Sequence, residues 1–166
     1  MYFYADIFII LFEYCELKEK LKLKSTTQDL YKLLHVTIIP PKYCHLINNK
    51  IIQNMKLHTL YASHNNRITD EGIKYMKLHT LYAYSGRITD EGIKNMKLHT
   101  LYTSGNNGIT DEGIKNMKLH TLYAYGGSRI TDEGIKNMKL HTLCANGNTT
   151  VSYNIRNYVK LEKIEK

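Results

Sequence analysis

The chain has 166 residues, which predicts one domain, or one domain with a small appendage, and argues against a large multidomain enzyme. Hydrophobic residues make up 43 % of it, but no stretch offers about 18 uninterrupted apolar residues, which argues against a membrane-spanning helix. The net charge of +8 comes from 23 Lys and Arg interspersed with 15 Asp and Glu. This mixing indicates a solvated surface rather than a concentrated stripe that binds nucleic acid.

The cysteines and the first residues predict the compartment. Cys15, Cys44 and Cys144 are odd in number, far apart and free of any C-x-x-C pair. This pattern favours a reducing compartment, the cytosol or the nucleus. Asp6 and Glu13 interrupt the apolar start MYFYADIFIILFEYC and no basic residue precedes it, so we do not expect a secretory signal.

Residues 1–33 are predicted to form a small helical segment ahead of the repeats. Their apolar residues recur at helical spacing and fit three short helices that extend to about residue 34. The apolar positions are Ile7, Ile10, Leu11, Tyr14, Leu17, Leu21, Leu30, Leu33 and Leu34.

Internal repetition is the most informative feature of the sequence and predicts the fold. A first string, MKLHTL, recurs in steps of 20 or 21 residues, and such a step is typical of leucine-rich repeats. A second string, ITDEGIK, stands between the copies, and the differences in length fall in the Ser-, Gly- and Asn-containing residues before it. The copies of MKLHTL begin at Met55, Met76, Met96, Met117 and Met138. The copies of ITDEGIK begin at Ile68, Ile88, Ile109 and Ile130.

Each repeat is predicted to contain a strand, a turn and a short helix. In the first strand, Leu60 and Ala62 alternate with Thr59 and Tyr61, so that the first pair faces the core and the second pair faces outward. No repeat buries its apolar side alone, so we expect the repeats to stack. The predicted fold class is an α/β leucine-rich-repeat solenoid, with parallel strands on its concave side and short helices on its convex side.

A threonine is predicted to begin the helix of each repeat. Thr69 fits an N-cap, Asp70 and Glu71 place negative charge in the first turn, and Ile73 and Met76 return to the core. We interpret the repeated Asp-Glu pairs as helix-end charge rather than catalytic carboxylates, because they recur without a unique partner.

The turn after each strand is predicted to hold an asparagine that bonds backbone, as in other leucine-rich repeats. Asn65, Asn106 and Asn148 stand eight positions after the first leucine of their repeats. Gly86 and Gly127 fill the equivalent place in the other two repeats, so the series of asparagines is incomplete.

Both flanks of the five repeats, which span residues 55–150, are predicted to cap the stack. Residues 34–54 fit a degenerate capping repeat, in which Pro40-Pro41 would blunt the exposed edge of the sheet. Its core positions, found by a step of 21 residues, are Val36, Ile39, Ile47, Ile52 and Met55. Residues 151–166 fit a C-terminal capping helix with Ile155, Tyr158 and Val159 on one side.

Five histidines recur at one position of the repeat, yet we predict no metal, cofactor or catalytic residue. Zinc ligands converge and usually include Cys or carboxylates, so a duplicated polar residue at the start of each strand is the favoured interpretation. Imidazoles about 5 Å apart would resist simultaneous protonation, which predicts lowered pKa values. The Gly-rich turns lack the setting of a phosphate-binding loop. The histidines are His58, His79, His99, His120 and His141.

The outward face of the predicted sheet is the candidate partner-binding site. Tyrosine rings offer a large, rigid contact area with a polar tip and are enriched at protein interfaces. Rings in register also stabilise a sheet by stacking on one another, which is the alternative interpretation. The candidate residues are Thr59, Tyr61, Thr80, Tyr82, Tyr84, Thr100, Tyr102, Thr121, Tyr123, Tyr125 and Thr142.

Two motifs resemble known families. The pattern D-I-x-I-x-x-F-x-Y from Asp6 to Tyr14, followed by Leu17 and Leu21, resembles a degenerate F-box. The unit ITDEGIKNMKLHTL is similar to the repeats of F-box/leucine-rich-repeat proteins, and in particular to the near-identical repeat arrays of giant viruses such as mimiviruses.

The resemblance implies a non-catalytic adaptor of a cullin-type ubiquitin ligase, acting in the cytoplasm or nucleus, or in the host cytoplasm if the chain is viral. The F-box-like positions would dock on the small cullin adaptor, while the repeats would hold a target protein. The alternative is a free-standing leucine-rich-repeat module that has an interaction or structural role without a ubiquitin ligase. The adaptor-binding candidates are Ile7, Ile10, Leu11, Tyr14, Leu17 and Leu21.

Overall fold

The computed structural model describes residues 38–39, 41–53, 55–105 and 108–152. The chain divides into two units, residues 1–37 and 38–166, and all the described residues belong to the second. The helices predicted before residue 38, with all six adaptor-binding candidates, lie outside the described residues, as does the helix predicted after Ser152. The boundaries predicted at residues 33, 54 and 150 stay predictions.

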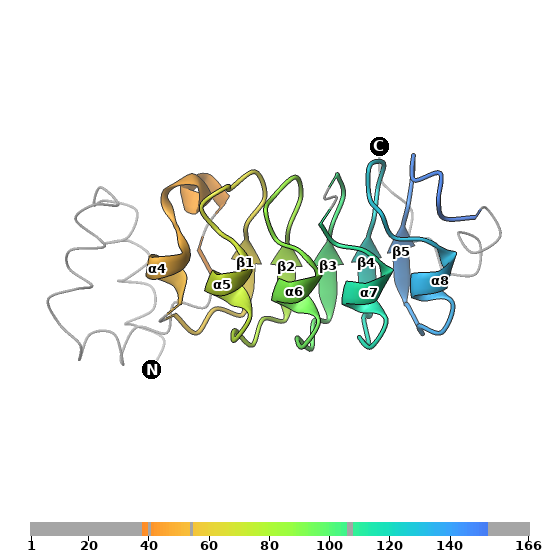
Figure 1. Ribbon diagram of the computed structural model, residues 1–166, viewed down its shortest axis with the longest axis horizontal. Helices are drawn as coiled ribbons and strands as arrows, with labels where there is room; N and C mark the ends of the chain where they lie inside the picture. Colours follow the sequence, from red (N-terminus) through yellow and green to blue (C-terminus); the bar gives the residue numbers. More distant parts are fainter. Residues whose placement is uncertain (1–37, 40, 54, 106–107, 153–166) are drawn as a thin grey trace, which may run out of the picture. The chain divides into compact units, whose positions relative to one another are not determined.

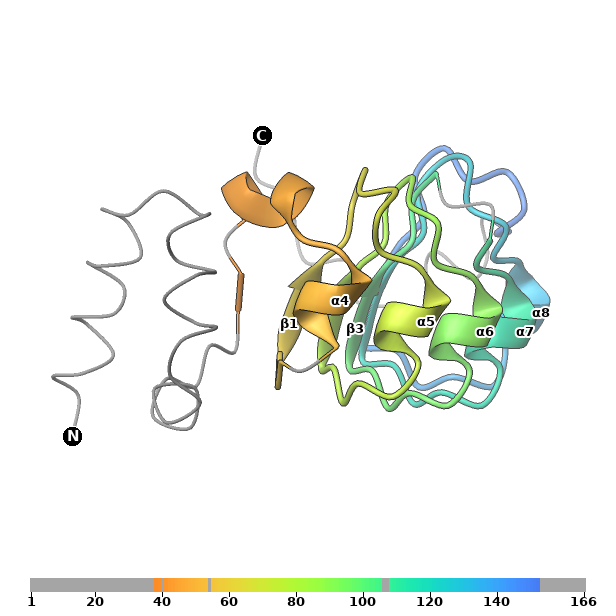
Figure 2. The ribbon, with the colours of Figure 1, turned by 60° about the vertical axis from the view of Figure 1, so that its left-hand side comes forward.

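Within the described residues, five short strands form one parallel sheet in chain order (Figure 1). The strands are β1 (Thr59–Tyr61), β2 (Thr80–Tyr82), β3 (Thr100–Tyr102), β4 (Thr121–Tyr123) and β5 (Thr142–Cys144). A 3-10 helix, η1 (Pro41–Leu46), and five α-helices accompany them: α4 (Asn49–Ile52), α5 (Asp70–Ile73), α6 (Asp90–Ile93), α7 (Asp111–Ile114) and α8 (Asp132–Ile135). Figure 2 shows the α-helices stacked as a second layer beside the sheet. A parallel sheet of five strands that alternate with short helices fits the predicted leucine-rich-repeat solenoid.

The strands pair in the register that the repeats predict. Leu60 of β1 pairs with Leu81 of β2, and Leu81 pairs with Leu101 of β3. These leucines are fully buried, and so is Ala62, which confirms their predicted inward orientation. Thr59 is also buried, although it was expected to face outward, because it lies beside Ile38, its neighbour in the sheet.

Isoleucines from the turns and helices complete the core. Ile68 and Ile73 are fully buried in the first repeat, as are Ile88 and Ile93 in the second. The methionine that follows each helix varies, since Met96 and Met117 are buried whereas Met76 and Met138 are half-buried. Apolar residues of neighbouring repeats thus shield one shared interior, as stacking requires.

The segment before the first repeat follows the same plan. Ile38 pairs with Thr59 in the parallel direction, which places Ile39 beside Leu60, and Ile39 is buried. Ile47 and Ile52 are also buried, at the positions that the 21-residue step assigns to them. Val36 and Pro40 lie outside the described residues.

Two residues of this segment take part in helix starts. Pro41 begins η1, where its fixed φ angle suits a first helical turn, rather than lying along the sheet edge as predicted. Asn48 caps α4, and its side-chain oxygen accepts a hydrogen bond from the Ile51 backbone N–H at 3.1 Å.

The aspartate that opens each helix links it to the next repeat. Asp70 accepts hydrogen bonds from the Thr89 backbone N–H at 2.8 Å and from the Thr89 hydroxyl at 2.6 Å. Asp90 makes the same two bonds with Thr110, and Asp111 makes them with Thr131. The series begins with Asn49, whose side-chain oxygen accepts from the Thr69 backbone N–H at 2.9 Å and whose amide N–H donates to the Thr69 hydroxyl oxygen at 2.8 Å. It ends where Ser152 N–H donates to Asp132 at 2.7 Å. These aspartates are therefore structural links between repeats as well as helix-end charges.

The glycine in each copy of ITDEGIK makes room for this link. A Cβ atom at Gly92 would overlap the Asp70 carboxylate, and one at Gly113 would overlap that of Asp90. The same holds for Gly134 and Asp111. Glycine costs helix stability compared with alanine, but here it lets the carboxylate of the preceding repeat lie against the helix.

Buried asparagines bond backbone carbonyls, as predicted, and these carbonyls belong to the preceding repeat. The Asn65 side chain donates to the carbonyls of Cys44 and, at 3.0 Å, Ile47. The Asn148 side chain donates to the carbonyls of Ala124 and Ile130 at 3.0 and 3.1 Å. Asn106 lies outside the described residues.

In the fourth repeat, Ser128 rather than Gly127 takes the place of the asparagine. Gly127 has a φ of +78°, like Gly147 (+69°), which precedes Asn148. Ser128 N–H donates to the carbonyl three residues earlier, as Asn148 N–H does. The turn of the fourth repeat therefore contains one more residue than that of the fifth repeat before the glycine with positive φ. Counting positions from the first leucine of each repeat does not reveal this difference.

We predict that Gly113→Ala destabilises the chain by about 1–3 kcal/mol, because the new methyl group overlaps the Asp90 carboxylate. Urea unfolding of Gly113→Ala, Asp90→Ala and the double variant measures this coupling. In the Asp90→Ala background the second substitution should cost less, since the carboxylate is gone and only the close approach to the backbone Cα of that residue, at 3.1 Å, remains. Equal costs in both backgrounds would contradict the steric explanation.

We predict that Thr103→Val stabilises the chain by about 1–3 kcal/mol, because Thr103 is fully buried and its hydroxyl has no hydrogen-bond partner within the described residues. Valine keeps the volume and removes the polar atom. Thr103→Ser, which keeps the hydroxyl and loses the methyl group, is the matched control. The hydroxyl explanation fails if urea unfolding finds the Val variant no more stable than the parent chain.

Candidate partner-binding face

The outward side of β1–β5 brings the candidate threonines and tyrosines together in two columns. Because the buried leucines point inward, the residues on either side of each leucine point outward. Strand register aligns threonine with threonine and tyrosine with tyrosine across the sheet. We call this surface, with Tyr84 and Tyr125 in the adjoining turns, the Thr/Tyr face. Apart from Thr59, its threonines and tyrosines are half-buried or exposed.

The four strand tyrosines form a continuous stack. Ring centroids lie 4.3 Å apart between Tyr61 and Tyr82, 4.0 Å between Tyr82 and Tyr102, and 4.2 Å between Tyr102 and Tyr123. Adjacent planes differ by 6–17°, so each ring covers the face of its neighbour. Along the interior of the stack a ligand therefore meets ring edges and hydroxyl groups, not free aromatic faces.

The tyrosine hydroxyls lie in a partly desolvated environment. Burial raises the pKa of Tyr61, and the neighbouring Tyr82 raises it further. Burial also raises the pKa of Tyr102, again with a contribution from Tyr82. These hydroxyls thus remain neutral hydrogen-bonding groups well above physiological pH.

The stack ends at β5, and the two turn tyrosines lie beside it rather than in it. Cys144 pairs with Tyr123 and so takes the place of a fifth tyrosine. The Tyr125 ring lies 6.0 Å from that of Tyr123 at an angle of 49°. Tyr84 is 42 % exposed, and its ring meets His64 edge-on at 4.7 Å.

The five repeat histidines form a second stack, which borders the threonine column. Consecutive ring centroids lie 4.5 Å apart, with planes 13–17° from parallel. In each of the last four repeats Nδ1 lies 3.2 Å from the hydroxyl oxygen of the next residue, as between His79 and Thr80. Sequence reasoning treated these histidines as duplicated polar residues and missed that they flank the candidate face. Their exact 20- or 21-residue recurrence was the available signal.

The described residues hold no group of three or more His, Cys, Asp or Glu that could bind a metal ion. The histidine rings lie parallel, so their nitrogens do not converge on one point. Burial raises the pKa of the Cys44 thiol to about 11, which keeps it protonated at neutral pH. None of the helices within the described residues is long and apolar enough to cross a bilayer.

Comparison with known proteins finds leucine-rich repeats in this chain. The family model described as "Leucine Rich repeat" matches residues 53–77 and 94–118. Each match covers the turn before one strand, the strand and the helix that follows it. No curated protein matches the chain. Leucine-rich repeats are typically protein-binding modules, and the two matched units contribute β1 and β3 to the Thr/Tyr face.

The lowered pKa values of two histidines in the stack predict that folding is sensitive to acid. Desolvation lowers the pKa of His79, and the neighbouring His99 and His58 lower it further. Desolvation likewise lowers the pKa of His120, followed by the effects of His141 and His99. As the pH falls below about 6.5, the unfolded chain therefore binds protons that the folded chain resists. The stability that depends on keeping these two histidines neutral is fully present above that pH and is lost as the pH falls towards their folded pKa values.

We predict that the urea concentration at the midpoint of unfolding is lower at about pH 5.5 than at about pH 7.5. The double substitution His79→Gln/His120→Gln should make this decrease smaller. The substitutions remove two groups that become protonated more easily in the unfolded chain. His45→Gln is the control, because His45 is exposed in η1, away from the stack. Equal acid sensitivity in the double variant and the control would refute the assignment to the stack.

Proposed function

We propose that this chain is a non-catalytic adaptor that holds a target protein on its Thr/Tyr face. The observation that carries the proposal is the register of the strands, which aligns threonine hydroxyl groups across all five strands and tyrosine ring edges across β1–β4. Such a face combines apolar contact area with many hydrogen-bonding groups, which suits a protein surface.

The stacks also reduce the entropic cost of binding. Each interior ring, such as Tyr82 or Tyr102, lies between two neighbours about 4 Å away, so its rotamer is restricted before a partner arrives. Ordered side chains lose less conformational freedom on association than mobile ones. We place this face on the concave side of the solenoid, where repeat proteins present their extended binding surfaces.

The finer part of the proposal is that residues 1–33 act as a degenerate F-box. Ile7, Ile10, Leu11, Tyr14 and the leucines that follow would dock on a small cullin adaptor, and the repeats would present the target for ubiquitin transfer. The order of the two motifs in the sequence supports this part. In the alternative, a free-standing repeat module, the same face binds its partner and residues 1–33 contact no cullin adaptor. In both cases we place the protein in the cytoplasm or nucleus, following its cysteine pattern.

We predict that Tyr84→Ala/Tyr102→Ala weakens binding of the target at least about tenfold, because it removes two aromatic contacts from the Thr/Tyr face. Tyr75→Ala is the matched control, since Tyr75 is 87 % exposed and lies outside that face, after α5. Proteins that the parent chain and the Tyr75→Ala control capture, but that the double variant does not, are identified and purified. Their affinity for each of the three chains is then measured by titration. The face proposal is wrong if every captured protein binds all three chains equally.

The purified target also serves in a test of the F-box proposal. Ile10→Asp/Leu17→Asp in the intact chain should abolish co-elution with the cullin adaptor and leave the purified target bound. Absence of co-elution with the parent chain, together with retained target binding, would select the free-standing module instead.

A further inference from the structure

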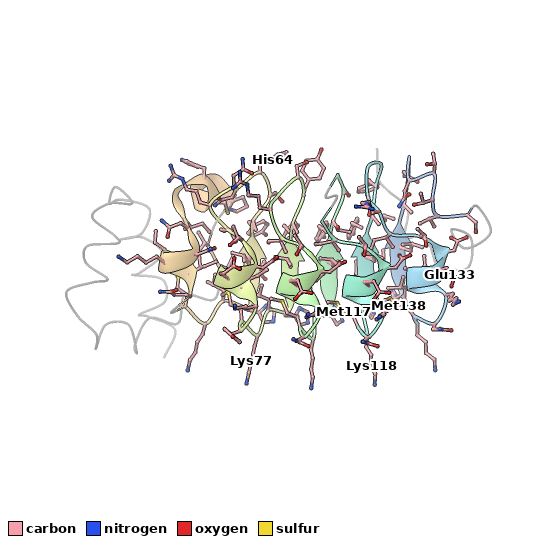
Figure 3. All side chains as sticks on the ribbon, in the orientation of Figure 1. His64, Lys77, Met117, Lys118, Glu133 and Met138 are labelled. Atoms are coloured by element: carbon pink, nitrogen blue, oxygen red, sulfur yellow. The ribbon has the colours of Figure 1, made fainter. Side chains whose placement is uncertain are left out.

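A row of five exposed lysines runs along one edge of the sheet. Each lysine stands three residues before the first residue of its strand, and the strands are parallel and in register, so all five lie at the amino-terminal edge. Lys77 and Lys118 extend from the edge opposite to that of His64 (Figure 3). We call these residues the lysine row: Lys56, Lys77, Lys97, Lys118 and Lys139. The expectation that the basic residues form no concentrated stripe is therefore wrong for this edge.

The structure separates this row from the negative charges that alternate with it in the sequence. Every Asp and Glu of the described residues occupies one of the first two positions of α5, α6, α7 or α8. Three of the glutamates form ion pairs with the lysine three residues later, as Glu91 does with Lys94 at 2.6 Å. Four aspartates bond the next repeat, as described above. Among the described residues, no carboxylate forms an ion pair with the lysine row.

The length of the row matches a short extended peptide. Neighbouring parallel strands lie about 4.8 Å apart, so five positions span roughly 19 Å. A peptide in extended conformation rises about 3.3 Å per residue and covers that distance with about six residues. The half-buried or exposed histidines, two positions after each lysine, place hydrogen-bonding nitrogens beside the same path.

The neighbouring aromatic stacks favour a protein segment over a nucleic acid. Proteins that bind single-stranded nucleic acids offer free aromatic faces on which bases stack. Here the interior rings of the histidine and tyrosine stacks already cover one another at 4.0–4.5 Å. Carboxylates need no stacking surface and interact with lysine as a point charge.

We infer that the lysine row is a docking edge for an acidic, extended segment of the target protein. The inference rests on the proposed function, because the row borders the histidine stack, which itself borders the Thr/Tyr face. A target held on that face would pass an acidic strand along the row. This segment would add electrostatic attraction and fix the direction in which the target lies across the repeats.

The test uses fluorescein-labelled octaglutamate, octaglutamine and octathymidylate with the full chain. We expect octaglutamate to bind, octaglutamine not to bind, and the affinity to fall as salt rises. Lys77→Gln/Lys97→Gln/Lys118→Gln should weaken octaglutamate binding at least about tenfold. Lys94→Gln/Lys115→Gln/Lys136→Gln removes the same charge from the helix layer and should change it by less than about twofold.

Two results would overturn the inference. Equal loss in both triple variants would show that net charge alone attracts the peptide. Tighter binding of octathymidylate, abolished by substitution of the lysine row, would assign the edge to nucleic acid. Tyr84→Ala/Tyr102→Ala separates this inference from the proposed function, because it should release the target and leave octaglutamate bound. A target lost with the tyrosine variant but unaffected by the lysine-row variant would refute the docking edge alone.

Discussion

The structure depends on the stacking of repeats that cannot bury their apolar residues alone. Leu60 and its equivalents are covered only because a similar repeat lies beside each of them. Directional bonds fix how the repeats stack. Asp70, Asp90 and Asp111 each accept from the backbone N–H and the hydroxyl of the threonine in the next repeat, and buried asparagines bond the backbone of the preceding repeat. The glycine beside each aspartate is the steric counterpart of this link. Apolar burial drives the association, and these bonds and the glycine set its register.

That register creates the surface chemistry. A shift of one residue would turn the threonines and tyrosines into the core, so the Thr/Tyr face exists only in the observed pairing. Once aligned, identical rings stack, which orders them but also covers their faces. The resulting surface repeats its threonine five times and its strand tyrosine four times. It therefore suits a partner that is itself extended or repetitive, or one that makes the same kind of contact at several positions.

Charge follows the same logic. In the sequence, lysines alternate with aspartates and glutamates, and the mixture resembles an ordinary solvated surface. In the folded repeats, the carboxylates lie at the starts of the helices, where they bond threonines and lysines. The lysine row lies just before the starts of the strands. A periodic sequence of mixed charge thus becomes stripes of single charge, because residues at the same place in each repeat share one edge.

The sequence by itself determined the repeat, its strand and helix, the inward leucines and the outward tyrosines, because these follow from a period of about 21 residues and from side-chain alternation. It also located Asn65 and Asn148. Only the tertiary structure showed that Asp70 bonds Thr89, that Gly92 is required by Asp70, that Ser128 replaces an asparagine and that the lysines form a row. Each of these depends on atoms about 20 residues apart in the chain or on turn geometry. A local pattern contains neither, since both arise from the way one repeat lies on the next.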